Sequence, residues 1–206
     1  MAILRKIVIL VFLKLNLFAL VAQQKINYEQ VFAKNYEAEY AGKYSQAIQE
    51  MKQIYKANDY FMNIRLGWLH YLDKKNTTSI SYYSRAIKLK PYSIEARLGI
   101  IKPYSAREEW EKVKIEYVQI LKIDSQNTVA NYWLGVIYYN QKNYAEAVKL
   151  FEKNVNLYPL DYDSVIMLAW TKLYLGVYTD AKLLFNHALL LRPNDDSAKS
   201  GLKLIN

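Results

Sequence analysis

The 206-residue sequence contains no cysteine, which excludes disulfides, thiolate metal ligands and a thiol nucleophile. Its stability must therefore come from packing alone. It has only 6 glycine and 4 proline residues and no Ser/Gly-rich linker, which argues against two domains on a tether. With 52% apolar and 23% charged residues, the composition is that of a globular chain and not of a disordered one.

Residues with catalytic chemistry are also scarce. The only histidines, His70 and His187, lie far apart in the sequence, and neither has an acid at metal-ligand spacing. No Gly-rich phosphate loop, GxSxG or HExxH motif occurs. Asp161 and Asp163 look like a carboxylate pair, but they flank a predicted helix start, where capping explains them. We therefore predict a protein that is not an enzyme, with no catalytic residue, cofactor or metal site.

The first 22 residues differ from the rest of the chain. Arg5 and Lys6 precede an apolar run that ends in a small residue, Ala22, before two glutamines. A basic start, a short apolar core and a small residue before a polar one are typical of a secretory signal peptide. We expect residues 1–22 to be removed and the protein to be exported to the periplasm or cell envelope.

The competing interpretation is an uncleaved membrane anchor formed by residues 7–22. Lys14 and Asn16 interrupt this apolar run, which is short for a bilayer. Retention would keep the protein close to a membrane. Removal of residues 1–22 would take away Arg5, Lys6 and Lys14 and lower the net charge from +9 to +6. This charge favours acidic partners or anionic surfaces, but the basic residues of the remaining chain are scattered, and Lys74–Lys75 is their densest pair.

One stretch, residues 128–159, sets the pattern of the chain. Apolar and small residues recur there at helical spacing: Leu134, Gly135, Tyr138, Tyr144, Ala147, Val148 and Phe151. A polar run at residues 140–143 divides them, and Pro159 follows because proline cannot continue a helix. The stretch predicts two antiparallel helices that share one apolar seam.

Corresponding positions recur along the chain. The residue that opens each second helix is Tyr44, Asn76, Trp110, Tyr144 or Tyr178. The smaller residue three positions later is Ala47, Ser79, Val113, Ala147 or Ala181. The large residue after it is Met51, Tyr83, Tyr117, Phe151 or Phe185. Each set is spaced by 32 residues once and then by 34 residues three times. This period and order of side chains resemble the tetratricopeptide repeat family over residues 28–195.

The resemblance implies an all-α fold, a right-handed superhelical α-solenoid of about five helix–turn–helix repeats with a C-terminal capping helix. The predicted repeats are residues 28–59, 60–93, 94–127, 128–161 and 162–195, followed by a cap at residues 196–206. The first repeat is degenerate. In the third, Pro103 falls inside the first helix, opposite the carbonyl of Gly99, and predicts a kink or early stop there.

In this family the first helices line the concave side, which usually holds the ligand. Reading their inner positions gives a candidate partner-binding groove formed by Phe61, Ile64, Trp68, Tyr71, Lys102, Tyr132, Val136, Tyr139, Ile166 and Trp170. Lys102 is the only base in it, so a clamp for a peptide's C-terminal carboxylate is absent. Two interpretations stay open: the aromatic residues pack against neighbouring helices, or they form a groove for a partner segment.

The leading functional hypothesis is a non-catalytic protein–protein interaction scaffold of the cell envelope that binds a protein or peptide segment. The alternative is a binder of an anionic envelope polymer or glycan, which would need bases around the groove. A third hypothesis, RNA binding, is disfavoured because the export signal and the lack of a repeated base-reading position oppose it, so no nucleic acid is expected. We expect a monomer, since a capped solenoid has no need of a second copy.

Overall fold

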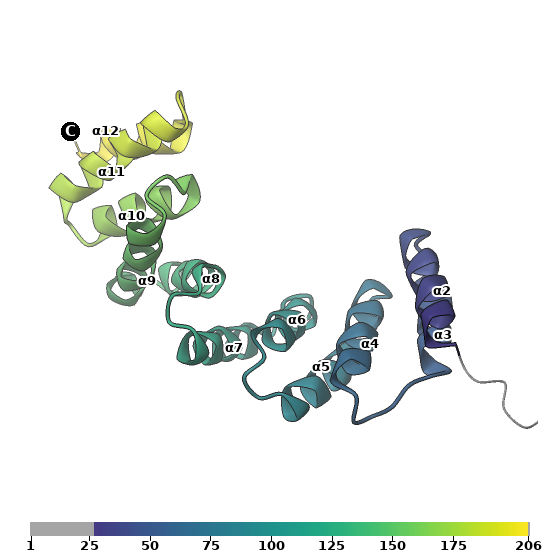
Figure 1. Ribbon diagram of the computed structural model, residues 1–206. Coiled ribbons are helices and arrows are strands. Elements are labelled where there is room, and N and C mark those ends of the chain that lie inside the picture. The colour runs from purple at the N-terminus through teal and green to yellow at the C-terminus, as the bar shows by residue number, and fades with distance from the viewer. Residues whose placement is uncertain (1–26, 206) are drawn as a thin grey trace, which may run out of the picture.

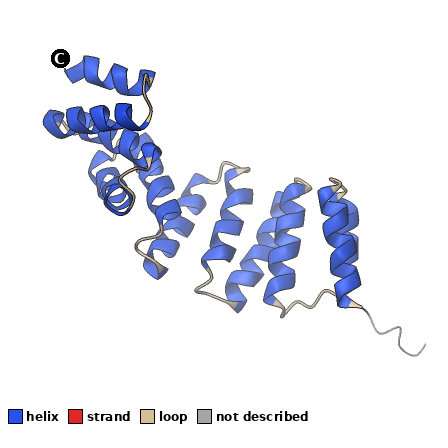
Figure 2. Ribbon diagram, turned by 45° about the horizontal axis from the view of Figure 1, so that its top comes forward, coloured by secondary structure: helices blue, strands red, loops and turns tan. Residues whose placement is uncertain are grey.

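The computed structural model describes residues 27–205, and every regular element in that range is an α-helix (Figures 1 and 2). The helices are α2 (Tyr28–Tyr40), α3 (Tyr44–Lys52), α4 (Tyr60–Leu72), α5 (Asn76–Leu89), α6 (Ile94–Ser105), α7 (Trp110–Ile123), α8 (Thr128–Asn140), α9 (Tyr144–Leu157), α10 (Tyr162–Tyr174), α11 (Tyr178–Leu191) and α12 (Asp196–Ile205). The predicted all-α solenoid is confirmed. The predicted signal peptide, residues 1–22, lies outside the described residues.

The helices pair into five successive repeats and a terminal helix. Figure 1 shows the pairs stacked along a curved array, with α4, α6 and α8 on the inner side of the bend and α5, α7 and α9 on the outer side. Each repeat range read from the sequence holds one antiparallel pair. The inner helices are therefore the first helices of their repeats.

Each first helix begins with a side-chain cap. The capping residues are Asn27, Asp59, Ser93, Asn127 and Asp161. In each case a side-chain oxygen accepts the backbone N–H of the residue three positions later, which satisfies one donor that the helix itself leaves free. The capping role predicted for Asp161 is confirmed, since it accepts from the Ser164 N–H at 3.3 Å.

The turns inside the repeats share one backbone conformation. Its left-handed residue is glycine in the first and last repeats, Gly42 at φ +70° and Gly176 at φ +76°. In the middle repeats Lys74, Glu108 and Lys142 take the same place at φ 57–59°. The next N–H bonds to the carbonyl five residues back, as from Asn143 to Tyr138 at 2.9 Å. This closure ends the first helix and fixes where the second begins.

A large side chain from the second helix of a repeat packs against a glycine in a neighbouring first helix. Tyr83 of α5 is 3% exposed and lies against glycines of both neighbours, Gly67 in α4 and Gly99 in α6. Phe185 meets Gly201 of α12 in the same way, whereas Phe151 meets Gly135 of α8, the first helix of its own repeat. The small and large positions predicted to form the seam are buried in all five repeats.

Pro103 does not end its helix. Helix α6 continues past it to Ser105, so the predicted early stop at Gly99–Pro103 is wrong. Pro103 lies in the last turn of α6, where only a few residues remain to be disturbed. Gly99 is explained by the Tyr83 ring and not by the proline. The predicted bend stays a prediction.

Helix α12 covers the last seam of the array. Ala198 is fully buried, Gly201 is buried, and Leu202 and Ile205 pack against the core of the fifth repeat. The Trp170 indole N–H donates to Ser197 at 2.8 Å and links the cap to α10. The expected cap is therefore a packed part of the array.

Candidate partner-binding surface

The inner face of the first three repeats holds a chain of charged and aromatic contacts. The buried Arg65 of α4 forms an ion pair with Glu39 of α2, and its Nε donates to Asn35 Oδ1 at 2.7 Å. Glu39 also accepts the Trp68 indole N–H at 2.6 Å. The Arg65 guanidinium lies 4.0 Å from the centre of the Tyr36 ring. These contacts hold the Trp68 ring in place and neutralise Arg65 within the protein.

Lys102 extends this chain to α6. Its Nζ lies 5.8 Å from the centre of the Trp68 ring, which in turn packs against Tyr71 with centroids 5.7 Å apart. Lys102 is exposed, while Trp68 and Tyr71 are half-buried. The structure thus brings three of the predicted groove residues together on adjacent repeats.

An exposed row of rings borders this region. Phe32, Tyr36 and Tyr40 recur at every fourth residue of α2, and Phe32 also contacts Phe61 of α4 at 5.4 Å. Tyr40 is 85% exposed and Phe61 51% exposed. Phe32 packs against the core of the first repeats, whereas Tyr36, Tyr40 and Phe61 leave apolar surface free to meet another molecule.

A second aromatic cluster lies in the last two repeats. Trp170 stacks on Tyr174 at 6.0 Å, and Tyr174 stacks on Tyr144 at 5.0 Å. Tyr139 contacts both tyrosines edge to face, and burial together with these neighbours raises the pKa of its phenol. The Tyr139 phenol therefore stays neutral near pH 7. Tyr174, which sequence reasoning missed, joins the cluster one helical turn after Trp170.

The other predicted groove residues differ in exposure. Ile64 and Val136 are half-buried, and Tyr132 packs against Phe151 at 6.0 Å. Ile166 is only 8% exposed and lies in one core cluster with Ala198 of α12. The cap covers Ile166, so we remove it from the candidate surface.

Two open clefts flank Trp133, a residue that the sequence reasoning missed. The larger, about 740 Å³, lies where the α9–α10 linker passes the start of α8, and we call it the linker cleft. The other, about 630 Å³, lies between α7 and α8 and includes Trp110 and Tyr117. Positions equivalent to Trp133 are glycine in α6 and α12, where a ring of the preceding helix enters.

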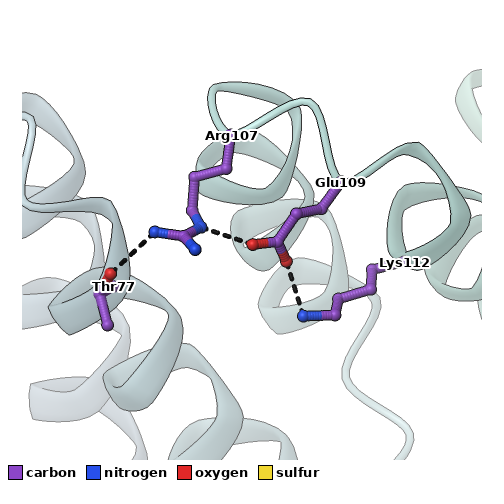
Figure 3. A network of polar contacts seen from close by, with 4 residues as sticks. All are labelled: Thr77, Arg107, Glu109 and Lys112. Atoms are coloured by element: carbon purple, nitrogen blue, oxygen red, sulfur yellow. Dashed lines mark hydrogen bonds and ion pairs between the residues drawn. The ribbon is translucent and has the colours of Figure 1, made fainter.

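Polar contacts along the turn edge also join successive repeats. Figure 3 shows Arg107 of the α6–α7 turn donating to Thr77 of α5 at 2.9 Å and to Glu109 at 2.5 Å. Lys112 completes the set at 2.7 Å from Glu109, and both bases hold the pKa of the Glu109 carboxyl below its usual value. The groups are largely exposed, so this network orients the turn and adds little stability.

His70 is a buried packing residue. His70 is 5% exposed and stacks on Tyr82 at 5.2 Å, with neither ring nitrogen hydrogen-bonded. Burial, with Lys52 and Lys75 nearby, lowers its pKa to about 4. Residues 27–205 contain no cluster of three His, Asp or Glu that could hold a metal. None of the helices in that range is long and apolar enough to cross a bilayer.

Comparisons with known proteins agree with this architecture. Tetratricopeptide repeat family models match residues 33–94 and 129–161. Superkiller protein 3 of Schizosaccharomyces pombe is 27% identical over 121 residues, which cover 55% of this chain. The chain spans only 9% of that protein, so the likeness concerns repeats and not the whole.

Solved structures show the same fold. A tetratricopeptide repeat protein from Parabacteroides merdae superposes with a TM-score of 0.72 at 20% identity, over 86% of this chain and 72% of its own. MamA superposes with a TM-score of 0.68 at 18% identity, over 79% of this chain and 90% of its own. YrrB is described as a tetratricopeptide repeat protein with an unusual peptide-binding site. It superposes with a TM-score of 0.65 at 18% identity, over 79% of this chain and 81% of its own. The family models thus identify tetratricopeptide repeats in residues 33–94 and 129–161, and the solved structures, at 18–20% identity, show that the chain has the same fold.

Proposed function

We propose that this protein is a non-catalytic interaction scaffold of the cell envelope that binds a segment of a partner protein along its inner face. The proposed surface, called here the inner aromatic surface, comprises Phe61, Ile64, Trp68, Tyr71, Lys102, Tyr132, Val136, Tyr139 and Trp170. The observation that carries the proposal is that α4 bears both the exposed ring of Phe61 and the fixed rings of Trp68 and Tyr71.

The chemistry of this surface favours a protein segment. Aromatic rings held by neighbours offer apolar area at low entropic cost, which is typical of residues that dominate binding energy. The buried charge of Arg65 is already neutralised by Glu39, so a partner need not supply an acid to it. The described peptide-binding site of YrrB shows that this fold accommodates peptides.

The alternative, an anionic envelope polymer or glycan, needs bases around the surface. Lys102 is the one exposed base of the predicted groove, and it lies over the Trp68 ring. A single cation gives a polyanion little to bind. RNA binding lacks support for the same reason, because no row of lysine or arginine side chains follows the inner helices.

The envelope location rests on the sequence alone. If residues 1–22 are a cleaved signal peptide, the mature protein begins after Ala22. If they are an uncleaved anchor, residues 7–22 stay in the membrane. Intact-mass measurement of the protein from its native cells distinguishes the two. A monomer is proposed because α12 covers the terminal seam.

Chemical crosslinking and pull-down from the native cell extract tests the binding surface. The test variant is Phe61→Ala/Trp68→Ala, and the matched control is Tyr92→Ala/Trp110→Ala, which removes two exposed aromatics away from the inner face. Circular dichroism establishes that both fold. We expect a partner captured by the wild type and the control to be lost from the test variant. Equal capture by all three would contradict the proposal.

A further inference from the structure

The linker cleft has a chemical character that the rest of the array lacks. Its walls include the exposed side chains of Val129, Trp133 and Tyr158, and its polar lining includes Asn154, Asp161 and Asp163. A volume of about 740 Å³ is in the range of ligand-binding pockets and exceeds one side chain.

Asn154 departs from the pattern of the array. The equivalent positions in the other repeats hold buried apolar residues, Ile54, Ala86, Ile120 and Ala188. Asn154 is 2% exposed and its amide donates to the Thr128 carbonyl at 2.9 Å. The amide also donates to Ser164 Oγ at 3.3 Å, and its Oδ1, which has no hydrogen-bond donor, is shielded from solvent. Asn154 is therefore a polar lining residue held by the protein, and the carboxylates of the cleft are the groups open to a ligand.

The same cleft is negatively charged although the chain as a whole is basic. Asp163 is exposed in the first turn of α10, and Asp161 caps that helix. Within residues 27–205 neither carboxylate forms an ion pair with a lysine or arginine. Their field reaches the cleft wall, since burial and these two carboxylates raise the pKa of the Tyr132 phenol.

We infer that the linker cleft binds an arginine or lysine side chain presented by an apolar stretch of the partner segment. The aliphatic stem packs on the rings of Trp133 and Tyr158, and the cationic head lies against the exposed Asp163 carboxylate. Arginine fits best because its guanidinium has five N–H donors and stacks on aromatic faces. The inference rests on the proposed function and names the chemistry of the partner.

The test uses a matched pair of capped peptides, Gly-Leu-Arg-Leu-Gly and the same peptide with citrulline, which keeps the shape of arginine and removes its charge. The side-chain N–H resonances of the 4 tryptophans of the full-length ¹⁵N-labelled protein report where each peptide binds. We expect the arginine peptide to shift the Trp133 resonance and to bind about fivefold more tightly than the citrulline peptide.

Three variants locate the interaction. Asp163→Asn should weaken the arginine peptide about fivefold, whereas Asn154→Ala, which restores the alanine found in the second and fifth repeats, should change the affinity little because the Asn154 Oδ1 is shielded from solvent. Asp196→Asn, which removes a carboxylate from the first turn of α12, should change nothing. Circular dichroism shows that each variant folds.

Other outcomes overturn the inference. Equal affinity for the two peptides, or no effect of Asp163→Asn, removes the charge recognition. A shift of Trp68 without one of Trp133 places the peptide on the inner aromatic surface, which supports the proposed function and refutes the cleft. No saturable shift of any tryptophan refutes the cleft as well, and the crosslinking experiment then decides the proposed function by itself.

Discussion

Replacing Gly99 by alanine tests how the second and third repeats are joined. A Cβ at this position would meet the Tyr83 ring, with Cε1 nearest, Cζ at 2.7 Å and Cδ1 at 2.8 Å. Carbon atoms pack at about 3.5 Å or more, so something must move. The ring has little freedom, because it is 3% exposed and Gly67 lies on its other side, where a Cβ would be 2.9 Å away.

Two effects of opposite sign act on this variant. Alanine is the better helix former by about 1 kcal/mol in a helix interior. Overpacking a filled core costs about 1–3 kcal/mol, and the upper end applies because the ring is held from both sides. We expect Gly99→Ala to lower the free energy of unfolding by about 2 kcal/mol, the difference between these two effects.

Urea denaturation followed by circular dichroism measures the change. In the double variant Gly99→Ala/Tyr83→Leu, the smaller side chain makes room for the new methyl group, so the two substitutions should be strongly non-additive. A stabilised Gly99→Ala protein, as helix propensity alone would give, would refute the close approach of α5 and α6.

Three further predictions concern single residues. Lys142→Gly should raise the free energy of unfolding by about 1 kcal/mol in the same urea assay, because lysine is strained at φ 59°. The pKa of His70 in the folded protein is about 4, below its usual value of 6.5, so the unfolded state binds more protons between these values. The free energy of unfolding therefore falls as the pH drops from 6.5 towards 4. His70→Phe should flatten this dependence of stability on pH. Arg107→Ala should lower the free energy of unfolding by less than about 1 kcal/mol in the urea assay, because the network of Figure 3 is exposed. A larger loss would show that this network stabilises the fold.

The sequence predicts the repeats well because several independent signals recur at one spacing. The seam residues, from Ala47 to Phe185, are buried as expected, and the Asp161 cap is present. These signals are local or come from adjacent repeats, so a period and a hydrophobic pattern suffice to find them.

What the sequence does not reveal depends on contacts between neighbouring units. Arg65 would be expected in water as a lone charge, yet Glu39 and Asn35 of the preceding repeat bury it. Ile166 shares the spacing of the inner residues, but α12 covers it. Trp133 could have been noticed, since glycine stands at its equivalent position in α6, although the clefts beside it follow only from the packing.

A photoreactive side chain on the inner face tests the central claim most directly. Phe61 is replaced by p-benzoylphenylalanine, which preserves an aromatic ring at an exposed site, and Tyr92, 83% exposed in the loop before α6, receives the same group as a control. After illumination in the native cells, the account predicts a discrete adduct with one partner protein from position 61 and none from position 92. No adduct from position 61, or the same adducts from both positions, would contradict a binding surface on the inner face.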